Sequence, residues 1–169
     1  KTGEIDSITI NNIRKIHNNS LIFFPLIETQ GLIISDSESR GVFVRSYKSE
    51  DLKNKSLIIN NIIKGRIYYD NSNEIILGYA LANKLKVDVG SMVKLAMPKS
   101  DKTILGNIPR FKTLIVSGIF DIGMYEYDSN FLFSSPKISR KLLKLNVNNF
   151  THIEIETNTP NKVENIQKI

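Results

Sequence analysis

The chain of 169 residues contains no cysteine and no tryptophan. The absence of cysteine excludes disulfides, thiolate metal sites and a cysteine nucleophile. Apolar runs are short, and none approaches the ~18–20 residues that a membrane-spanning helix needs. Neither Gly-x-Gly-x-x-Gly nor a P-loop occurs, which excludes nucleotide binding by those motifs. The chain starts at Lys1 without methionine or a signal-peptide pattern, so we expect a segment of a longer protein.

The composition is that of a folded protein, with 41% hydrophobic and 24% charged residues. Its length suits one domain or two small interlocked lobes with a real core. The net charge of +6 would usually indicate an anionic partner. The lysines are scattered rather than clustered on one segment, so the charge alone does not predict nucleic-acid binding.

Hydrophobic periodicity predicts an α+β fold. The pattern predicts helices at 4–17, 78–85 and 135–145, and an extended segment from Leu21 to Ser35 that is broken at Pro25. Strands are expected at 41–47, 74–77, 91–97, 111–120, 130–133 and 151–157. This order predicts one lobe built from both ends of the chain and a β-rich lobe inserted between them.

The candidates for catalysis are weak, and we predict no enzyme activity. Asp121, Glu126 and Asp128 could pair as acid and base, but acids in a glycine-containing loop more often accept backbone N–H groups. Ser91 and Lys94 match Ser-x-x-Lys on a predicted strand, whereas the catalytic version starts a helix. No Cys/His/Asp spacing indicates a metal site, and no cofactor is implied.

The segment from Pro98 to Pro109 is the most informative stretch for function. Two predicted strands flank it, so we expect a long, projecting hairpin loop, whereas ordinary hairpin loops take two to five residues. Ile104, Leu105 and Ile108 are apolar, although a projecting loop should be exposed to solvent. They either fold back on the domain or offer an apolar hook to a partner.

Several motifs resemble one family. The run from Glu74 to Leu95, with Ile-Leu-Gly at 76–78 and Val-Gly-Ser-Met-Val at 89–93, resembles the MacB-like periplasmic domain of ABC transporter permeases. Gly106…Pro109-Arg110, then Gly118-Ile-Phe-Asp and Gly123-Met-Tyr-Glu-Tyr-Asp, resemble the LolC/LolE family of lipoprotein-releasing permeases. Arg40 to Arg45 resembles the hairpin that lies upstream in that family. The likeness covers essentially the whole chain.

The resemblance implies a domain on the periplasmic face of the bacterial inner membrane, set between membrane-spanning helices of the parent chain. A Porter lobe would comprise 1–47 and 130–169, and a mainly β Sabre lobe would comprise 48–129, including a hook hairpin at 98–109. The complex would release lipoprotein cargo, driven by a separate LolD-like ATPase and with a second permease subunit.

In this family the hook captures the periplasmic chaperone LolA. The residues that would form the hook here are Pro98, Ile104, Leu105, Gly106, Ile108 and Pro109, and those of an adjoining pad are Lys94 and Arg110. Two alternatives stay open: a force-transmitting domain of a MacB- or FtsX-type permease, and a basic β-rich nucleic-acid-binding module. Steep salt dependence would mark the latter.

Overall fold

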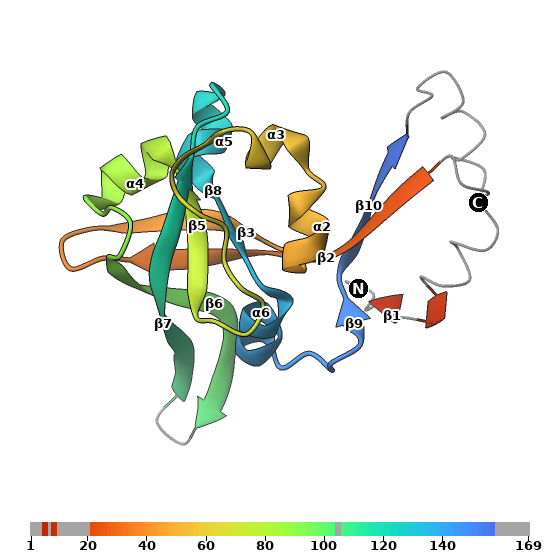
Figure 1. The fold of residues 1–169 in the computed structure, drawn as a ribbon. Helices are drawn as coiled ribbons and strands as arrows, with labels where there is room; N and C mark the ends of the chain where they lie inside the picture. The colour runs from red at the N-terminus through yellow and green to blue at the C-terminus, as the bar shows by residue number, and fades with distance from the viewer. Residues whose placement is uncertain (1–4, 7, 10–20, 104–105, 158–169) are drawn as a thin grey trace.

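The computed structural model describes residues 5–6, 8–9, 21–103 and 106–157. Its centre is a ring of strands in which each pairs with the next and the last returns to the first (Figure 1). In ring order these are β2 (Leu21–Ile34), β3 (Ser39–Ser46), β8 (Phe131–Ser134), β5 (Glu74–Gly78), β7 (Gly106–Phe120) and β6 (Met92–Thr103). The ring is a small closed β-barrel, which leaves few unpaired strand edges.

Alternating residues of these strands fill the barrel. Ile33, Val44, Leu77, Leu95 and Leu132 belong to one buried cluster. Helices α4 (Tyr79–Leu85) and α6 (Pro136–Leu143) pack against the same cluster. Figure 1 shows them on opposite sides of the β2–β3 hairpin. The main core is therefore inside the barrel, as period-two alternation requires.

A second cluster covers part of the barrel's outer surface. The helices α2 (Ser49–Lys53) and α3 (Ser56–Ile59) contribute Leu52 and Ile58, which pack with barrel residues such as Phe24, Tyr47 and Phe133. Helix α5 (Tyr125–Asn130) adds the partly buried Tyr127. The remaining outer surface, over β2, β6 and β7, carries exposed apolar side chains.

Three short strands and one longer strand complete the described part of the chain. Strand β4 (Ile62–Gly65) pairs with β7, and β10 (His152–Thr157) pairs with the first half of β2. Strand β1 (Ile5–Asp6) pairs with β9 (Asn149–Phe150). The N-terminal and C-terminal segments of the chain therefore meet.

Two sequence predictions about the first 35 residues are wrong. Ile5 and Asp6 form a strand rather than the start of a helix, because their backbone pairs with Phe150 and Asn149. Ile8 and Thr9 are helical, and the rest of 4–17 lies outside the described residues. Strand β2 also runs through Pro25 without a break. Around Pro25 the strand pairs with β10 alone, since β3 joins only from Ile27, and a proline is tolerated on a strand with an open edge.

Other local predictions are confirmed, including α+β as the fold class. Strand β5 and helix α4 occupy the predicted positions, with Leu81 and Leu85 buried. Gly90 has φ +90°, a conformation that side chains with a Cβ resist. Pro136 opens helix α6 after Ser135. Among the described helices, none is long and apolar enough to cross a membrane.

Candidate functional site

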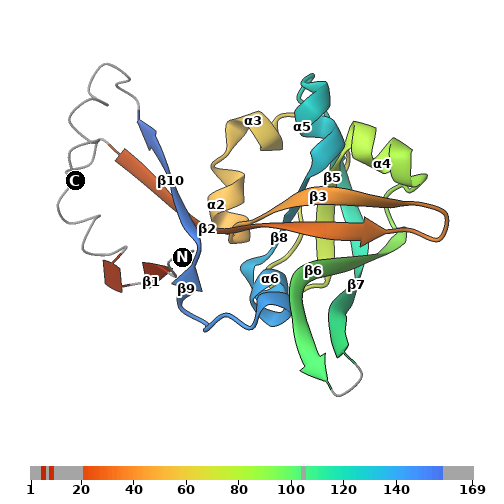
Figure 2. The ribbon, with the colours of Figure 1, turned by 180° about the vertical axis from the view of Figure 1, so that it is seen from behind.

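The β6–β7 hairpin is the most distinctive projection of the molecule. Its strands pair from Met92↔Ile115 to Thr103↔Gly106, with one register shift between Met97 and Ser100. The predicted twelve-residue loop is therefore wrong, because both strands continue through it as a ladder. Figures 1 and 2 show this end of the hairpin extending beyond the barrel at the bottom of each view.

The predicted hook residues lie along this extension. Pro98 falls within the register shift, where a missing backbone N–H costs little. Gly106, Ile108 and Pro109 are in β7, opposite Thr103, Asp101 and Ser100 respectively. Ile104 and Leu105 lie outside the described residues.

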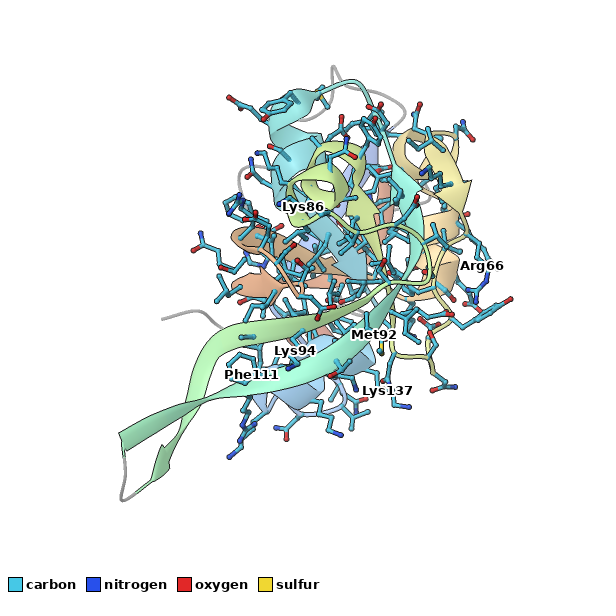
Figure 3. The ribbon with its side chains drawn as sticks, turned by 90° about the vertical axis from the view of Figure 1, so that its left-hand side faces the viewer. Arg66, Lys86, Met92, Lys94, Phe111 and Lys137 are labelled. Atoms are coloured by element: carbon cyan, nitrogen blue, oxygen red, sulfur yellow. The ribbon has the colours of Figure 1, made fainter. Side chains whose placement is uncertain are left out.

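The base of the hairpin presents an exposed apolar face. Paired residues of an antiparallel ladder share a face, so Met92 with Ile115 and Ala96 with Phe111 point outward from the barrel. Met92 is 68% exposed, Phe111 52% and Ile115 43%. Lys94 lies among them, opposite Thr113. Figure 3 shows Met92, Lys94 and Phe111 at the base of the projecting hairpin. We call these four residues, Met92, Lys94, Phe111 and Ile115, the stem face.

The apolar character continues onto the neighbouring strands. Leu32 of β2 pairs with Ala96 and is 42% exposed, so it extends the stem face across β2. Within the described residues, the helices α2 and α3 cover a different part of the barrel, around Phe24 and Tyr47. The apolar residues lie on both sides of the exposed polar pair Lys94–Thr113, and a group of exposed apolar side chains of this kind is typical of a protein–protein contact.

Arg110, the second predicted pad residue, lies on the opposite face from Lys94. It pairs with Met97 and alternates with the outward-facing Phe111. Its guanidinium donates a hydrogen bond to the backbone carbonyl of Lys141 in α6 at 3.5 Å. The structure therefore does not bring Lys94 and Arg110 together on one face.

A group of lysines surrounds this inner side of the hairpin. Burial lowers the pKa of Lys112, and the positive charges of Lys141 and Lys137 lower it further. The inner face of the hairpin base is therefore mostly buried apolar core, and its basic residues Arg110 and Lys112 lie where it meets α6.

The acidic segment between β7 and β8 holds the backbone in place. Asp121 accepts the N–H of Gly123 and Asp128 accepts that of Ile122, both at 3.1 Å. Asp128 is 3% exposed, and burial raises its pKa. Glu126 lies in α5, where its backbone carbonyl accepts the side chain of Asn130 at 2.7 Å. The predicted structural role is confirmed for Asp121 and Asp128.

Sequence reasoning missed Met92, Phe111 and Ile115 as surface residues. The signal was present, because Leu114, Ile115 and Val116 are consecutive apolar residues and therefore place apolar side chains on both faces of β7, more than a strand with one solvent-exposed face needs. No group of three or more potential metal ligands occurs among the described residues. The arrangement is suited to docking a partner.

Comparison with solved structures defines the class of protein. No family model matches the chain. The extracellular domain of the noncanonical ABC-type transporter YknZ from Gram-positive bacteria superposes with a TM-score of 0.65 at 12% identity, covering 96% of this chain and 78% of that one. The periplasmic region of MacB from Actinobacillus actinomycetemcomitans gives 0.59 at 12% identity, covering 96% and 72%. The fold is that of a MacB-like periplasmic domain.

Sequence comparison finds similarity to one group of proteins within the class of MacB-like domains. The chain is 28% identical over 123 residues to the lipoprotein-releasing system transmembrane protein LolC of Neisseria meningitidis, and 27% identical over 123 residues to that of Xylella fastidiosa. Each match covers 72% of this chain and 30% of the relative, so the chain corresponds to under a third of the length of these proteins. These findings confirm the resemblance to the LolC/LolE family.

Proposed function

We propose that this chain is the periplasmic domain of a permease in a lipoprotein-releasing ABC transporter of the bacterial inner membrane. The matches to LolC and the MacB-like fold support this function. In this role the domain performs no chemistry. ATP hydrolysis belongs to a separate LolD-like subunit, and a second permease subunit and the lipoprotein cargo complete the assembly.

The proposal includes the two lobes that the family resemblance implies. The pairings β1–β9 and β10–β2 join the two ends of the chain and support a Porter lobe that draws on 1–47 and 130–169. Residues 48–129 form the Sabre lobe and contain the hairpin. Strand β2 belongs to both regions, since its second half pairs with β6.

We further propose that the β6–β7 hairpin docks a LolA-like periplasmic chaperone, with Leu105 and its neighbours at the tip. The observation that carries this is the long projecting ladder, which rises from the exposed apolar stem face. An apolar tip inside a lipid-binding cavity would bury area worth ~25 cal/mol per Å². An acyl chain competes for the same cavity, so empty chaperone binds best and cargo weakens the contact.

A capture experiment tests this proposal. The domain is immobilised and exposed to the cognate LolA-like chaperone, beside a variant whose residues 98–109 are replaced by Asn-Gly. Met97 and Arg110 are paired across the ladder, so a two-residue turn can join them. We expect capture by the parent domain, loss with the shortened hairpin and little dependence on salt. Equal capture by both domains would contradict the docking role.

A force-transmitting domain of a MacB-type permease is the second candidate, and the YknZ and MacB superpositions favour it. In that case the hairpin docks no lipoprotein chaperone. The parent domain would then fail to capture the chaperone at all concentrations tested. Nucleic-acid binding that weakens steeply with added salt would instead favour the basic-module alternative.

A further inference from the structure

Strand β10 carries a polar cluster that contacts the body of the domain. Within the described residues β10 pairs only with β2, over Leu21 to Leu26. Its isoleucines and glutamates alternate, and Glu154 lies opposite Phe24, on the face of β2 that α2 and α3 cover. Figure 1 shows β10 and this half of β2 leaving the barrel as a two-stranded ribbon. We call the paired segments 21–26 and 152–157 the ribbon.

Lys55 lies in the link between α2 and α3, and from there its side chain contacts the ribbon. Its ammonium is 3.1 Å from a Glu154 carboxylate oxygen and 2.6 Å from one of Glu156. Lys55 is only 8% exposed and lies 4.0 Å from the ring centroid of Phe24. A buried ammonium is favourable only with such carboxylate and aromatic partners.

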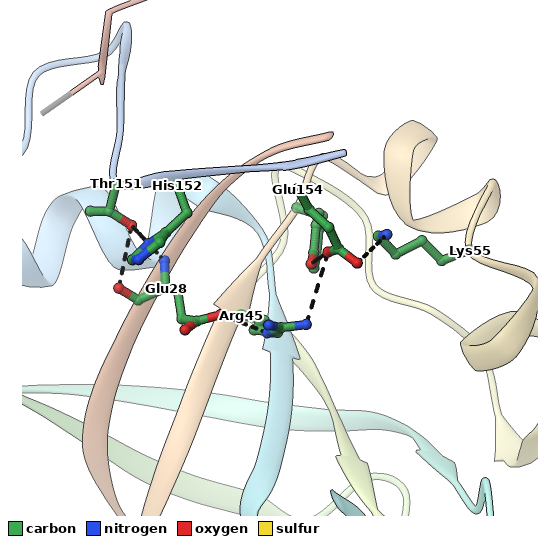
Figure 4. Close-up of polar contacts among 7 residues, drawn as sticks. Glu28, Arg45, Lys55, Thr151, His152 and Glu154 are labelled. Carbon is green, nitrogen blue, oxygen red and sulfur yellow. Dashed lines mark hydrogen bonds and ion pairs between the residues drawn. The ribbon is translucent and has the colours of Figure 1, made fainter. Parts of the chain in front are cut away.

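Glu154 is the centre of the cluster. It accepts a short hydrogen bond from the hydroxyl of Tyr47, and Arg45 lies 3.9 Å from the same oxygen (Figure 4). Arg45 in turn donates to Glu28 at 2.7 Å. Burial raises the pKa of Glu154, but Tyr47, Lys55 and Arg45 together outweigh it and keep that pKa below its usual value.

The cluster borders a cavity as well as buried apolar side chains, among them Phe24 and Ile58. A space of about 110 Å³ lies between Tyr47, Lys55, Tyr127 and Glu154. Polar contacts therefore add to the apolar packing of Phe24 and Leu26 where the ribbon meets the body. Such contacts can be exchanged for water, whereas a closely packed apolar core cannot be opened at a similar cost.

The ribbon is connected to the hairpin by a single strand. β2 pairs with β10 at its first half and with β6 over Leu32 to Ile34, opposite Ala96 to Lys94. Lys94 belongs to the stem face. A displacement of the ribbon therefore has a direct mechanical path through β2 to the base of the hairpin.

We propose that Glu154, with Lys55, Tyr47 and Arg45, is a latch that fixes the ribbon against α2–α3 and thereby sets the orientation of the hairpin base. The first part of this proposal, that the latch fixes the ribbon, stands on the geometry alone. The second part, that the latch sets the orientation of the hairpin base, rests on the proposed function, since it concerns regulation of the docking hairpin. Opening of the latch moves the ribbon away from Lys55 while the pairing between β10 and β2 persists.

Pulsed electron paramagnetic resonance tests the latch directly. Because the chain lacks cysteine, Lys53→Cys and Ile155→Cys place two nitroxide labels, on α2 and on the exposed face of β10. We expect a narrow distance distribution in the labelled parent. Glu154→Gln and Lys55→Met should each add a longer-distance population, while Glu38→Gln, which removes a carboxylate near Arg40 and Lys86, should not.

Lys55→Met keeps the side chain's apolar stem and guards against an unfolded Glu154 variant. If the folded variants reproduce the parent distribution, the latch is refuted. Affinity for the chaperone tests the second part: Glu154→Gln should weaken it by about 2- to 30-fold, the range expected for coupled sites. Unchanged affinity would refute the coupling to the hairpin. If even the parent domain binds no chaperone, the proposed function fails, while the distance distributions still decide the latch.

Discussion

Replacing Gly78 by alanine should destabilise the domain, although the backbone there suits any residue. Gly78 precedes α4 with φ −65° and ψ 147°, so alanine meets no conformational penalty. In such a position Gly→Ala usually stabilises a protein by about 0.4–1 kcal/mol through the unfolded state. The opposite is expected here because of a close contact. A Cβ on Gly78 would lie 2.1 Å from the carbonyl oxygen of Asp128 and 2.7 Å from its Cα.

These neighbours are backbone atoms and cannot swing aside. Helix α5 would have to move by roughly 1 Å, and with it Asp128, whose carboxylate holds the Ile122 amide. Overpacking of this kind costs about 1–3 kcal/mol. Urea unfolding measures the change, with Gly41→Ala as the matched control, because a Cβ there meets nothing within 4 Å. If both variants unfold at the same urea concentration, the contact between Gly78 and Asp128 is not as tight as the structure shows.

Three further predictions concern stability. Leu77→Ala removes a fully buried side chain of the barrel core and should cost about 2–5 kcal/mol in urea unfolding; a loss under 1 kcal/mol would contradict the packed interior. Arg66→Gln breaks a bidentate pair with Glu74, at 2.6 and 3.0 Å, in which Arg66 is largely exposed, and should change the free energy of unfolding by about 1 kcal/mol or less. The pKa of Glu154 lies below 4.5, so its contribution is complete above that pH and is lost as the pH falls through the folded-state value. Tyr47, Lys55 and Arg45 face Glu154 from the body and Glu156 lies beside it in β10, so protection of the β10 amides, corrected for the intrinsic pH dependence of exchange, should fall more between about pH 5 and 3 in the parent than in Glu154→Gln.

Much of the fold could be predicted because its local signals agree with the tertiary structure. The periodicity of 74–85 and the proline after Ser135 predict β5, α4 and α6. The hairpin was expected at the right place but with too long a loop. The residues from Lys99 to Thr103 are all polar, and only the partner strand determines that this stretch is extended.

The contacts between distant segments could not be predicted. Glu154 and Tyr47 are 107 residues apart, and nothing local in either segment indicates that they meet. The alternation at 152–157 predicts a strand but not which of its faces packs against the rest of the domain. The face that carries Glu154 and Glu156 contacts Lys55, while Ile155 on the other face is 41% exposed. The stem face was missed for a related reason, since burial of each face depends on which helices cover the barrel.

The central claim is that the hairpin docks a chaperone, and titration of the domain with its cognate LolA-like chaperone tests it most directly. Leu105→Asp should weaken binding by about 30-fold or more, which corresponds to ~2 kcal/mol. If Leu105 serves docking rather than packing, the melting temperature of the variant should stay nearly unchanged. Ile63→Asp, at an exposed apolar position on β4, is the matched control and should bind like the parent. If Leu105→Asp also binds like the parent, or if it unfolds the domain, Leu105 is not the docking tip and the account is contradicted.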